Sequence, residues 1–169
     1  MKKFLIIILL FSSNSFAIET IRFVDFNNLV LSSVAGKDIN KKIKKLSETE
    51  LSKLNKKQET LAEKETKLIA KKNILEAEVF QKELENLKKE INDFKKNRND
   101  KINEINKKQS IAKTQLIKEI NIILTDYASK NSISIILNKQ SVVAGKKELE
   151  ITNEIIDDLN KKIKTIKIE

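Results

Sequence analysis

The chain has 169 residues, a formal net charge of +10 from 34 basic and 24 acidic side chains, only two glycines and no proline. Such a charged, Gly- and Pro-poor composition indicates long helices rather than a β-sandwich or a doubly wound sheet. Cysteine and histidine are both absent, which excludes thiol nucleophiles, disulfides, Cys/His metal sites and catalytic triads with an imidazole base.

The stretch "MKKFLIIILLFSSNSFA" at residues 1–17 has the pattern of a secretory signal peptide. Two lysines precede an apolar run from Phe4 to Phe11, and Ser15-Phe16-Ala17 predicts cleavage after Ala17. An uncleaved membrane anchor is the alternative, but spanning a bilayer takes about 20 apolar residues, and residues 12–15 are polar. Without cysteine there is no lipid attachment site of the bacterial lipoprotein kind, so we expect a soluble mature chain outside the cytoplasm.

The next element is a predicted strand, "ETIRFVDF" at residues 19–26. Its apolar side chains alternate, which predicts a strand with at least one buried face. A short helical turn at Leu29 to Leu31 follows, and Gly36 is expected to break the chain before the long charged segment.

Residues 37–130 have a helical pattern with a coiled-coil-like apolar seam. Leu54, Leu61 and Leu68 are seven residues apart, and a second seam steps by four and three residues through Phe80, Leu84, Leu87, Ile91 and Phe94. Extending the first frame predicts apolar residues at 75, 82 and 89, where the chain has Leu75, Lys82 and Lys89. The frame therefore breaks between the two seams.

Two structures explain this break. A single straight helix over residues 37–130 would be about 140 Å long, with a stutter at the frame shift. We favour an antiparallel hairpin that turns between Lys72 and Glu76, with Asn73 capping a helix end and Glu76 and Glu78 in the first turn of the returning helix. The returning helix is the longer one, and from Ile111 it is expected to re-enter a compact base.

After residue 130 the pattern changes to strands and a short helix. Asn131 is a predicted left-handed cap, and "SISIILNKQSVVAGK" predicts strands at Ile133 to Leu137 and Ser141 to Ala144 joined by a hairpin turn. Thr152 is a predicted N-cap. The helix that follows it has an apolar face of Ile155, Ile156, Leu159 and Ile163.

The predicted fold is mainly α with a small β body: a long antiparallel helical hairpin, or coiled-coil-like arm, projects from a β-sheet oligomerisation body. We assign residues 18–36 and 111–169 to the body and residues 37–110 to the arm, with its tip near 72–76. So small a core is marginal by itself, which favours oligomerisation through the strands. The candidate oligomerisation residues are Ile21, Phe23, Val24, Ile135, Ile136, Leu137, Val142 and Val143.

The positive charge is concentrated in the arm. Residues 37–72 have 12 basic and 6 acidic side chains, whereas residues 131–169 have 7 and 6. Solvated helix faces supported by pairs such as Glu63 and Lys67 explain many individual lysines, but the net excess predicts salt-sensitive attraction of anionic partners. Nucleic acid is the usual partner for such a charge, and export argues against it.

The sequence lacks the residues that catalysis or nucleotide binding would need. "AGKD" at 35–38 and "AGKK" at 144–147 lack the first glycine and the Ser/Thr of a phosphate-binding loop. Asp25, Asp157 and Asp158 have no spacing that indicates a catalytic pair. We therefore expect no enzyme, no ATP cycle, no metal and no cofactor.

The order of these parts resembles the Skp/OmpH-like periplasmic chaperones. The resemblance covers residues 19–165 and is carried by "IRFVDFNNLV", "SVAGKDINKKI", "ILEAEVFQKELENLKKEI", "YASKNSISIILNKQSVV" and "ELEITNEIIDDLNKKIK". One departure is Asn131, where such proteins usually have glycine, and asparagine tolerates the same backbone conformation.

This resemblance implies a periplasmic homotrimer whose strands build a small body and whose three arms enclose a cavity. In the family, that cavity holds unfolded outer-membrane proteins and prevents their aggregation without ATP. Some members have been proposed to bind lipopolysaccharide, so contact with anionic lipid or lipopolysaccharide stays open. The alternatives are a structural coiled-coil protein of the cell envelope and a polyanion-binding module.

If the arm binds unfolded clients, its lysines and its apolar side chains are the candidate contacts. The lysines would attract acidic clients, and the apolar side chains would hold them through many weak contacts. The candidates are Lys64, Lys67, Lys71, Lys72, Leu61, Leu68, Leu75 and Phe80. The alternative for the apolar residues is that the hairpin uses them as its own seam, and we favour this for most of them.

Overall fold

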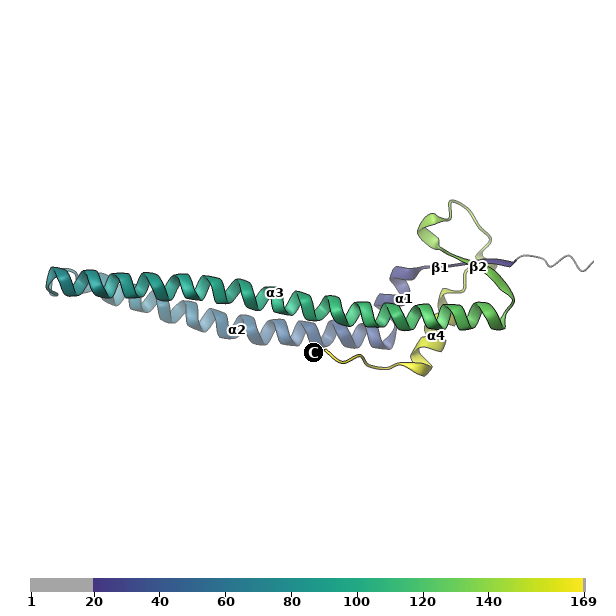
Figure 1. Cartoon of the computed structure of the whole chain (residues 1–169), viewed down its shortest axis with the longest axis horizontal. Helices are drawn as coiled ribbons and strands as arrows, with labels where there is room; N and C mark the ends of the chain where they lie inside the picture. Colours follow the sequence, from purple (N-terminus) through teal and green to yellow (C-terminus); the bar gives the residue numbers. More distant parts are fainter. Residues whose placement is uncertain (1–19, 169) are drawn as a thin grey trace, which may run out of the picture.

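The computed structural model describes residues 20–168, so the predicted signal peptide lies outside the described residues. The described chain forms a long two-helix rod with a small body at one end (Figure 1). The elements in order are β1 (Thr20–Val24), α1 (Phe26–Ser32), α2 (Val34–Ala70), α3 (Ala77–Lys130), β2 (Ile133–Asn138), the 3-10 helices η1 (Lys139–Ser141) and η2 (Lys147–Leu149), and α4 (Thr152–Lys162). The predicted fold class, a helical hairpin arm on a small β body, is confirmed.

The hairpin reverses where the frame of the seam breaks. α2 ends at Ala70 and α3 begins at Ala77, and the backbone N–H groups of Ile74 and Leu75 both donate to the carbonyl oxygen of Lys71 at 3.0 Å. The unbroken helix is therefore excluded. The cap at Asn73 was wrong because the C-terminal cap of α2 is Lys71.

The seam of the arm follows the predicted residues. Leu54, Leu61 and Leu68 of α2 are buried, and so is Leu87 of α3. Further α3 side chains pack partly buried against Leu61, Leu68 and Leu87: Phe80, Leu84, Ile91 and Phe94. Each helix thus covers the apolar stripe of the other.

The body joins the two ends of the chain. β1 and β2 pair as a parallel two-stranded sheet, with Ile21 opposite Ile135 and Phe23 opposite Leu137. The core beneath it is built from α1, α2, α3 and α4, and its fully buried large side chains are Leu29, Ile39, Leu116, Ile120, Ile155 and Leu159. The proposed residue limits of body and arm stay a prediction.

A tight corner connects α1 to α2. The buried Ser33 caps α2, since its Oγ accepts a hydrogen bond from the backbone N–H of Gly36 at 3.1 Å. The predicted break at Gly36 was wrong because this glycine lies inside the first turn of α2. A Cβ at this position would lie 1.7 Å from the carbonyl oxygen of Val30, so glycine is required for the close approach of α1.

The strand predicted at residues 141–144 was also wrong. After β2 the side chain of Asn138 accepts a hydrogen bond from the backbone N–H of Gln140 at 3.2 Å, and this contact starts the 3-10 helix η1. The chain then forms a loop in which Val143 is completely exposed. A local side-chain cap thus replaces the expected hairpin turn.

Two predicted caps form differently in the structure. Asn131 is the C-cap of α3 as predicted, but its φ is −107° and not left-handed. Its backbone N–H and side-chain amide both donate to the carbonyl oxygen of Tyr127, and Ser132 takes the positive φ of 52°. Thr152 lies inside the first turn of α4, and the N-cap is Ile151. The Thr152 hydroxyl instead accepts a hydrogen bond from the backbone N–H of Asp25 at 2.8 Å.

Candidate functional site

The candidate site is the surface of the arm near its tip. A hollow of about 300 Å³ between α2 and α3 brings together Lys64, Lys67 and Lys71 around Leu68. Carboxylates lie on the opposite side of this hollow, at Glu83 and Glu90. The site is therefore cationic on α2 and acidic on α3.

The predicted lysines differ in how strongly they are engaged within the chain. Lys64 forms an ion pair with Glu90 across the hairpin at 2.6 Å, and this hydrogen bond lowers the pKa of the Glu90 carboxyl. Lys67 has a longer contact of 3.8 Å with Glu63 on its own helix. Lys71 and Lys72 are exposed and form no ion pair with any described residue. These last two lysines are free to meet an anionic partner.

The predicted apolar residues are mostly inside the arm. Leu61 and Leu68 are only 4% and 7% exposed, while Leu75 and Phe80 are partly buried against the same cluster. Leu61 and Leu68 therefore belong to the seam of the hairpin, as the alternative interpretation held. A bound partner would reach them only if the helices separated.

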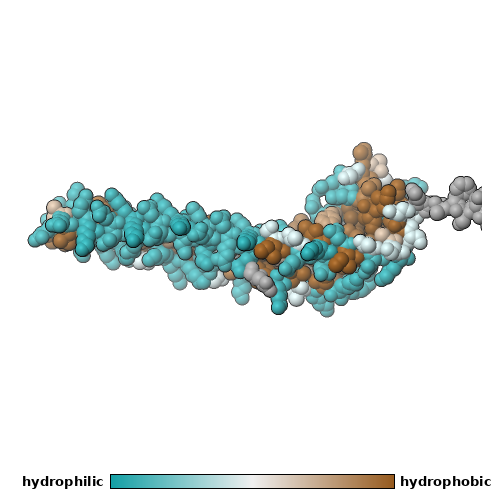
Figure 2. All heavy atoms as spheres, viewed as in Figure 1, coloured by the Kyte–Doolittle hydropathy of each residue, from teal (hydrophilic) through white to brown (hydrophobic). Residues whose placement is uncertain are grey.

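Sequence reasoning missed the apolar side chains that the tip exposes. Ile69, Ile74 and Val79 are 62%, 81% and 42% exposed. Apolar surface gathers at the end of an otherwise hydrophilic arm (Figure 2). A signal for Ile69 was available, because it follows Leu68 and so lies outside the seven-residue frame of the seam.

The body exposes a larger apolar surface. Ile21, Ile135 and Leu137 of the sheet are between 39% and 47% exposed, whereas Phe23 and Val24 are buried. Apolar surface is concentrated over this part of the body (Figure 2). A hollow of about 590 Å³ beside the sheet is lined mainly by apolar side chains, among them Val24, Leu124 and Ile136.

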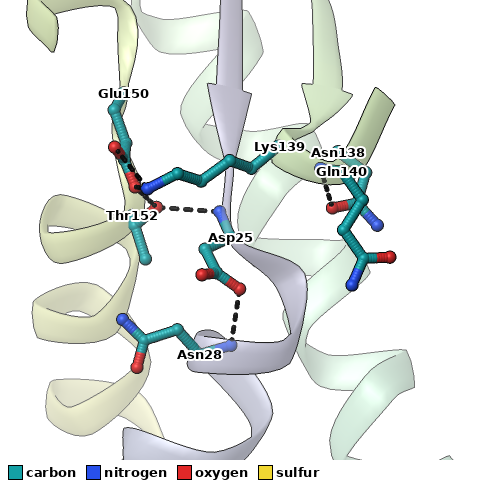
Figure 3. A network of polar contacts seen from close by, with 7 residues as sticks. All are labelled: Asp25, Asn28, Asn138, Lys139, Gln140, Glu150 and Thr152. Carbon is teal, nitrogen blue, oxygen red and sulfur yellow. Dashed lines mark hydrogen bonds and ion pairs between the residues drawn. The ribbon is translucent and has the colours of Figure 1, made fainter. Parts of the chain in front are cut away.

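A polar network ties the last part of the chain to the first (Figure 3). The Thr152 hydroxyl accepts from the backbone N–H of Asp25 and donates to Glu150 at 3.0 Å, while Lys139 Nζ donates to both carboxylate oxygens of Glu150 at 3.0 Å. The hydrogen bonds from Lys139 and then Thr152 lower the pKa of Glu150. Asp25 caps α1 by accepting from the backbone N–H of Asn28. Every group in this network has a structural partner.

Metal-binding clusters and membrane-spanning helices are both absent from the described part of the chain. Among residues 20–168 there is no cluster of three or more His, Cys, Asp or Glu side chains that could hold a metal ion. No helix in that range combines the length and apolar character needed to cross a membrane.

Comparison with known proteins identifies the family. A family model described as outer membrane protein (OmpH-like) matches residues 20–159. The chain belongs to the OmpH-like family. This match confirms the resemblance that the sequence motifs indicated.

The OmpH-like fold is also found in a crystal structure, that of a candidate outer membrane chaperone (OmpH-like) from Caulobacter crescentus CB15. The TM-score is 0.84 at 18% sequence identity, and the match covers 89% of each chain. At this identity the likeness shows the fold that the two chains share. None of the curated proteins compared with the OmpH-like chain matches it significantly.

Proposed function

We propose that this OmpH-like chain is an ATP-independent periplasmic holdase chaperone. It binds unfolded outer-membrane proteins in a cavity between cationic helical arms and prevents their aggregation. The observation that carries the proposal is the arm itself: its own seam is closed, and its excess positive charge is displayed on a rod that projects from a small body. Family membership supports a chaperone role.

Charge brings the client to the arm. Residues 37–72 carry a net charge of +6, and Lys71 and Lys72 at the tip have no ion-pair partner among the described residues. The field of such a surface speeds the encounter with an acidic polypeptide and weakens as salt is added. Acidic unfolded chains should therefore bind faster at low ionic strength.

Apolar contacts then hold the client. Because Leu61 and Leu68 are closed inside the seam, we assign this contact to the exposed Ile69, Ile74 and Val79, with Leu75 and Phe80 at the edge. Each contact is weak, so binding is multivalent and reversible. Release then needs no nucleotide, because a client that folds withdraws its own apolar side chains.

The body supplies oligomerisation. The apolar side chains exposed on the sheet, Ile21, Ile135 and Leu137, together with Val143 on the loop, would be covered by further copies of the chain. We propose a homotrimer, in which three arms surround one cavity. The mass of the purified mature protein in solution tests this directly, and a monomer would remove the cavity.

Light scattering tests the holdase function. A urea-denatured β-barrel outer-membrane protein is diluted into buffer with and without this chain, at several salt concentrations. Suppressed aggregation at low salt is expected. A structural envelope protein would give no suppression, and a polyanion-binding module would lose its client to added nucleic acid at equal salt.

A matched pair of variants tests the contribution of the tip. Lys71→Glu with Lys72→Glu should reduce suppression of aggregation and its salt dependence. Lys146→Glu with Lys147→Glu makes the same change in charge at the exposed start of η2 in the body. Equal loss in both variants would show that only net charge matters and that the tip has no special role.

A further inference from the structure

The last described residues of the chain run back along the arm. After α4 ends at Lys162, residues 163–168 lie beside α2 (Figure 1). This C-terminal segment is beyond residue 159, where the match to the OmpH-like family model ends.

A polar clasp fixes the middle of the segment. The Thr165 hydroxyl donates to Asp38 Oδ2 at 2.6 Å and accepts from Lys42 Nζ at 2.6 Å. Lys42 Nζ also lies 2.6 Å from Asp38 Oδ2, one helical turn away. The clasp thus places a hydroxyl of the segment between an acid and a base on the first turns of α2.

Apolar side chains hold the rest of the segment. Ile163, Ile166 and Ile168 pack partly buried against the body core, while Lys164 and Lys167 point to solvent. Ile163 has an extended backbone, with φ −137° and ψ 118°. The segment is therefore an extended, amphipathic strip with its isoleucines on the protein and its lysines outside.

Side chains, rather than a sheet ladder, supply the binding energy. Within residues 163–168 the one backbone–backbone hydrogen bond runs from the N–H of Ile163 to the carbonyl oxygen of Leu159. Ordering six residues costs conformational entropy, and an exposed clasp contributes little. Three partly buried isoleucines outweigh this cost by only a small margin, so the segment can exchange with a competitor.

We propose that the root surface, meaning the face of α2 at Asp38 and Lys42 with the adjoining apolar core, is a binding site for extended polypeptide. Its ligand is a segment with apolar β-branched side chains along one edge and a hydroxyl between them. The chain's own C-terminal segment occupies this site in cis. Displacement of the segment by unfolded clients rests on the proposed holdase function. The existence of the peptide site does not depend on that function.

Binding of a short peptide in trans tests the site without any client. The probe is a fluorescein-labelled peptide of sequence IKTIKIE, residues 163–169, and the protein is a chain that stops after Lys162. Saturable binding is expected by fluorescence anisotropy. The full chain should bind the probe at least about tenfold more weakly, because its tethered segment competes at high effective concentration.

Two controls make each result decisive. A probe with aspartate in place of both isoleucines at positions 166 and 168 should not bind, and equal binding of both probes would overturn the proposal. If the shortened chain lacks the helical circular dichroism of the full chain, the full-length Ile166→Asp variant replaces it. That variant should bind the IKTIKIE probe better than the wild type, and equal or absent binding would overturn the site.

Failure of this experiment and failure of the proposed function are distinguishable. A chain that suppresses aggregation but never binds the probe retains the holdase function and loses the root surface. A chain that binds the probe without suppressing aggregation keeps the peptide site and loses the holdase. Thr165→Val in the full chain should loosen the segment and raise probe binding. Probe binding equal to that of the wild type would show that the clasp does not hold the segment.

Discussion

The substitution Gly36→Ala measures how tightly the root of the arm is packed. A Cβ at position 36 would lie 1.7 Å from the carbonyl oxygen of Val30 and 2.9 Å from its carbonyl carbon. In an unconstrained helix, alanine would be favoured over glycine by about 1 kcal/mol. Overpacking costs about 1–3 kcal/mol or more, and here the obstacle is backbone, which cannot rotate away.

The clash therefore outweighs the gain in helix propensity. We expect the free energy of unfolding to fall by about 2 kcal/mol, which lowers the melting temperature by about 4–8 °C in a chain of this size. Thermal unfolding followed by circular dichroism measures the shift. The concentration of protomers must be held fixed, because oligomerisation contributes to apparent stability.

Gly145→Ala is the matched control for Gly36→Ala. A Cβ at position 145 would meet the side chain of Phe23 at 3.1 Å and that of Val142 at 3.4 Å, and neither glycine has a positive φ. The free energy of unfolding should change by no more than about 0.5 kcal/mol. If Gly36→Ala melted at or above the wild-type temperature, or both variants shifted equally, the argument from close approach would be refuted.

Four further substitutions test the core, the polar network and its titration. Leu116 is fully buried, while Ile122 on the same helix is 52% exposed. Urea unfolding should therefore show that Leu116→Ala lowers the free energy of unfolding by about 2–5 kcal/mol and Ile122→Ala by much less. Equal losses would contradict the packing. Thr152→Val removes the acceptor of the Asp25 N–H and should cost about 1–3 kcal/mol, with faster hydrogen exchange at that amide; unchanged exchange would speak against the bond. The pKa of Glu150 is lowered on folding from an ordinary value of 4.5, so its contribution to stability is complete above that pH and is lost as the pH falls through the folded-state pKa. Glu150→Gln should flatten this acid limb of the stability profile, and parallel profiles would disprove the linkage.

The arm could be predicted because its signals are local. Seven-residue spacing of Leu54, Leu61 and Leu68 fixes which face of α2 is apolar, and the loss of that spacing after Leu75 marks the reversal. Helix periodicity depends only on neighbours a few residues away, so no knowledge of the body is needed. The same reasoning identified the buried Ile155 and Leu159 of α4.

The N-cap of α4 could not be predicted because a distant residue competed for the Thr152 hydroxyl. Thr152 has the side chain of an N-cap, yet the Asp25 amide, 127 residues away, takes its hydroxyl. Asn160 accepts a hydrogen bond from the backbone N–H of Val34 at the start of α2 in the same way. A local preference worth about 1 kcal/mol is easily exceeded by a contact that also satisfies a buried donor.

The sequence indicated the lysines of the candidate site and favoured the seam for most of its apolar residues. The lysines Lys64, Lys67 and Lys71 do line one hollow, because they occupy one face of a single helix. Leu61 and Leu68 were candidates for contact, yet they are closed by α3, and Ile74 at the turn is the side chain that is left exposed. Exposure depends on what packs against a residue, which the spacing of residues in one helix does not specify.

The sequence by itself determined the class of the fold, the place of the turn and the seam of the arm, because helical periodicity and charge are properties of neighbouring residues. Three contacts were decided by the tertiary structure alone. Gly36 lets the Val30 carbonyl of α1 approach closely, the Thr152 hydroxyl accepts from the Asp25 N–H at the start of α1, and the C-terminal segment lies on α2. Each of these contacts joins residues from different elements. Their geometry exists only after the elements have packed.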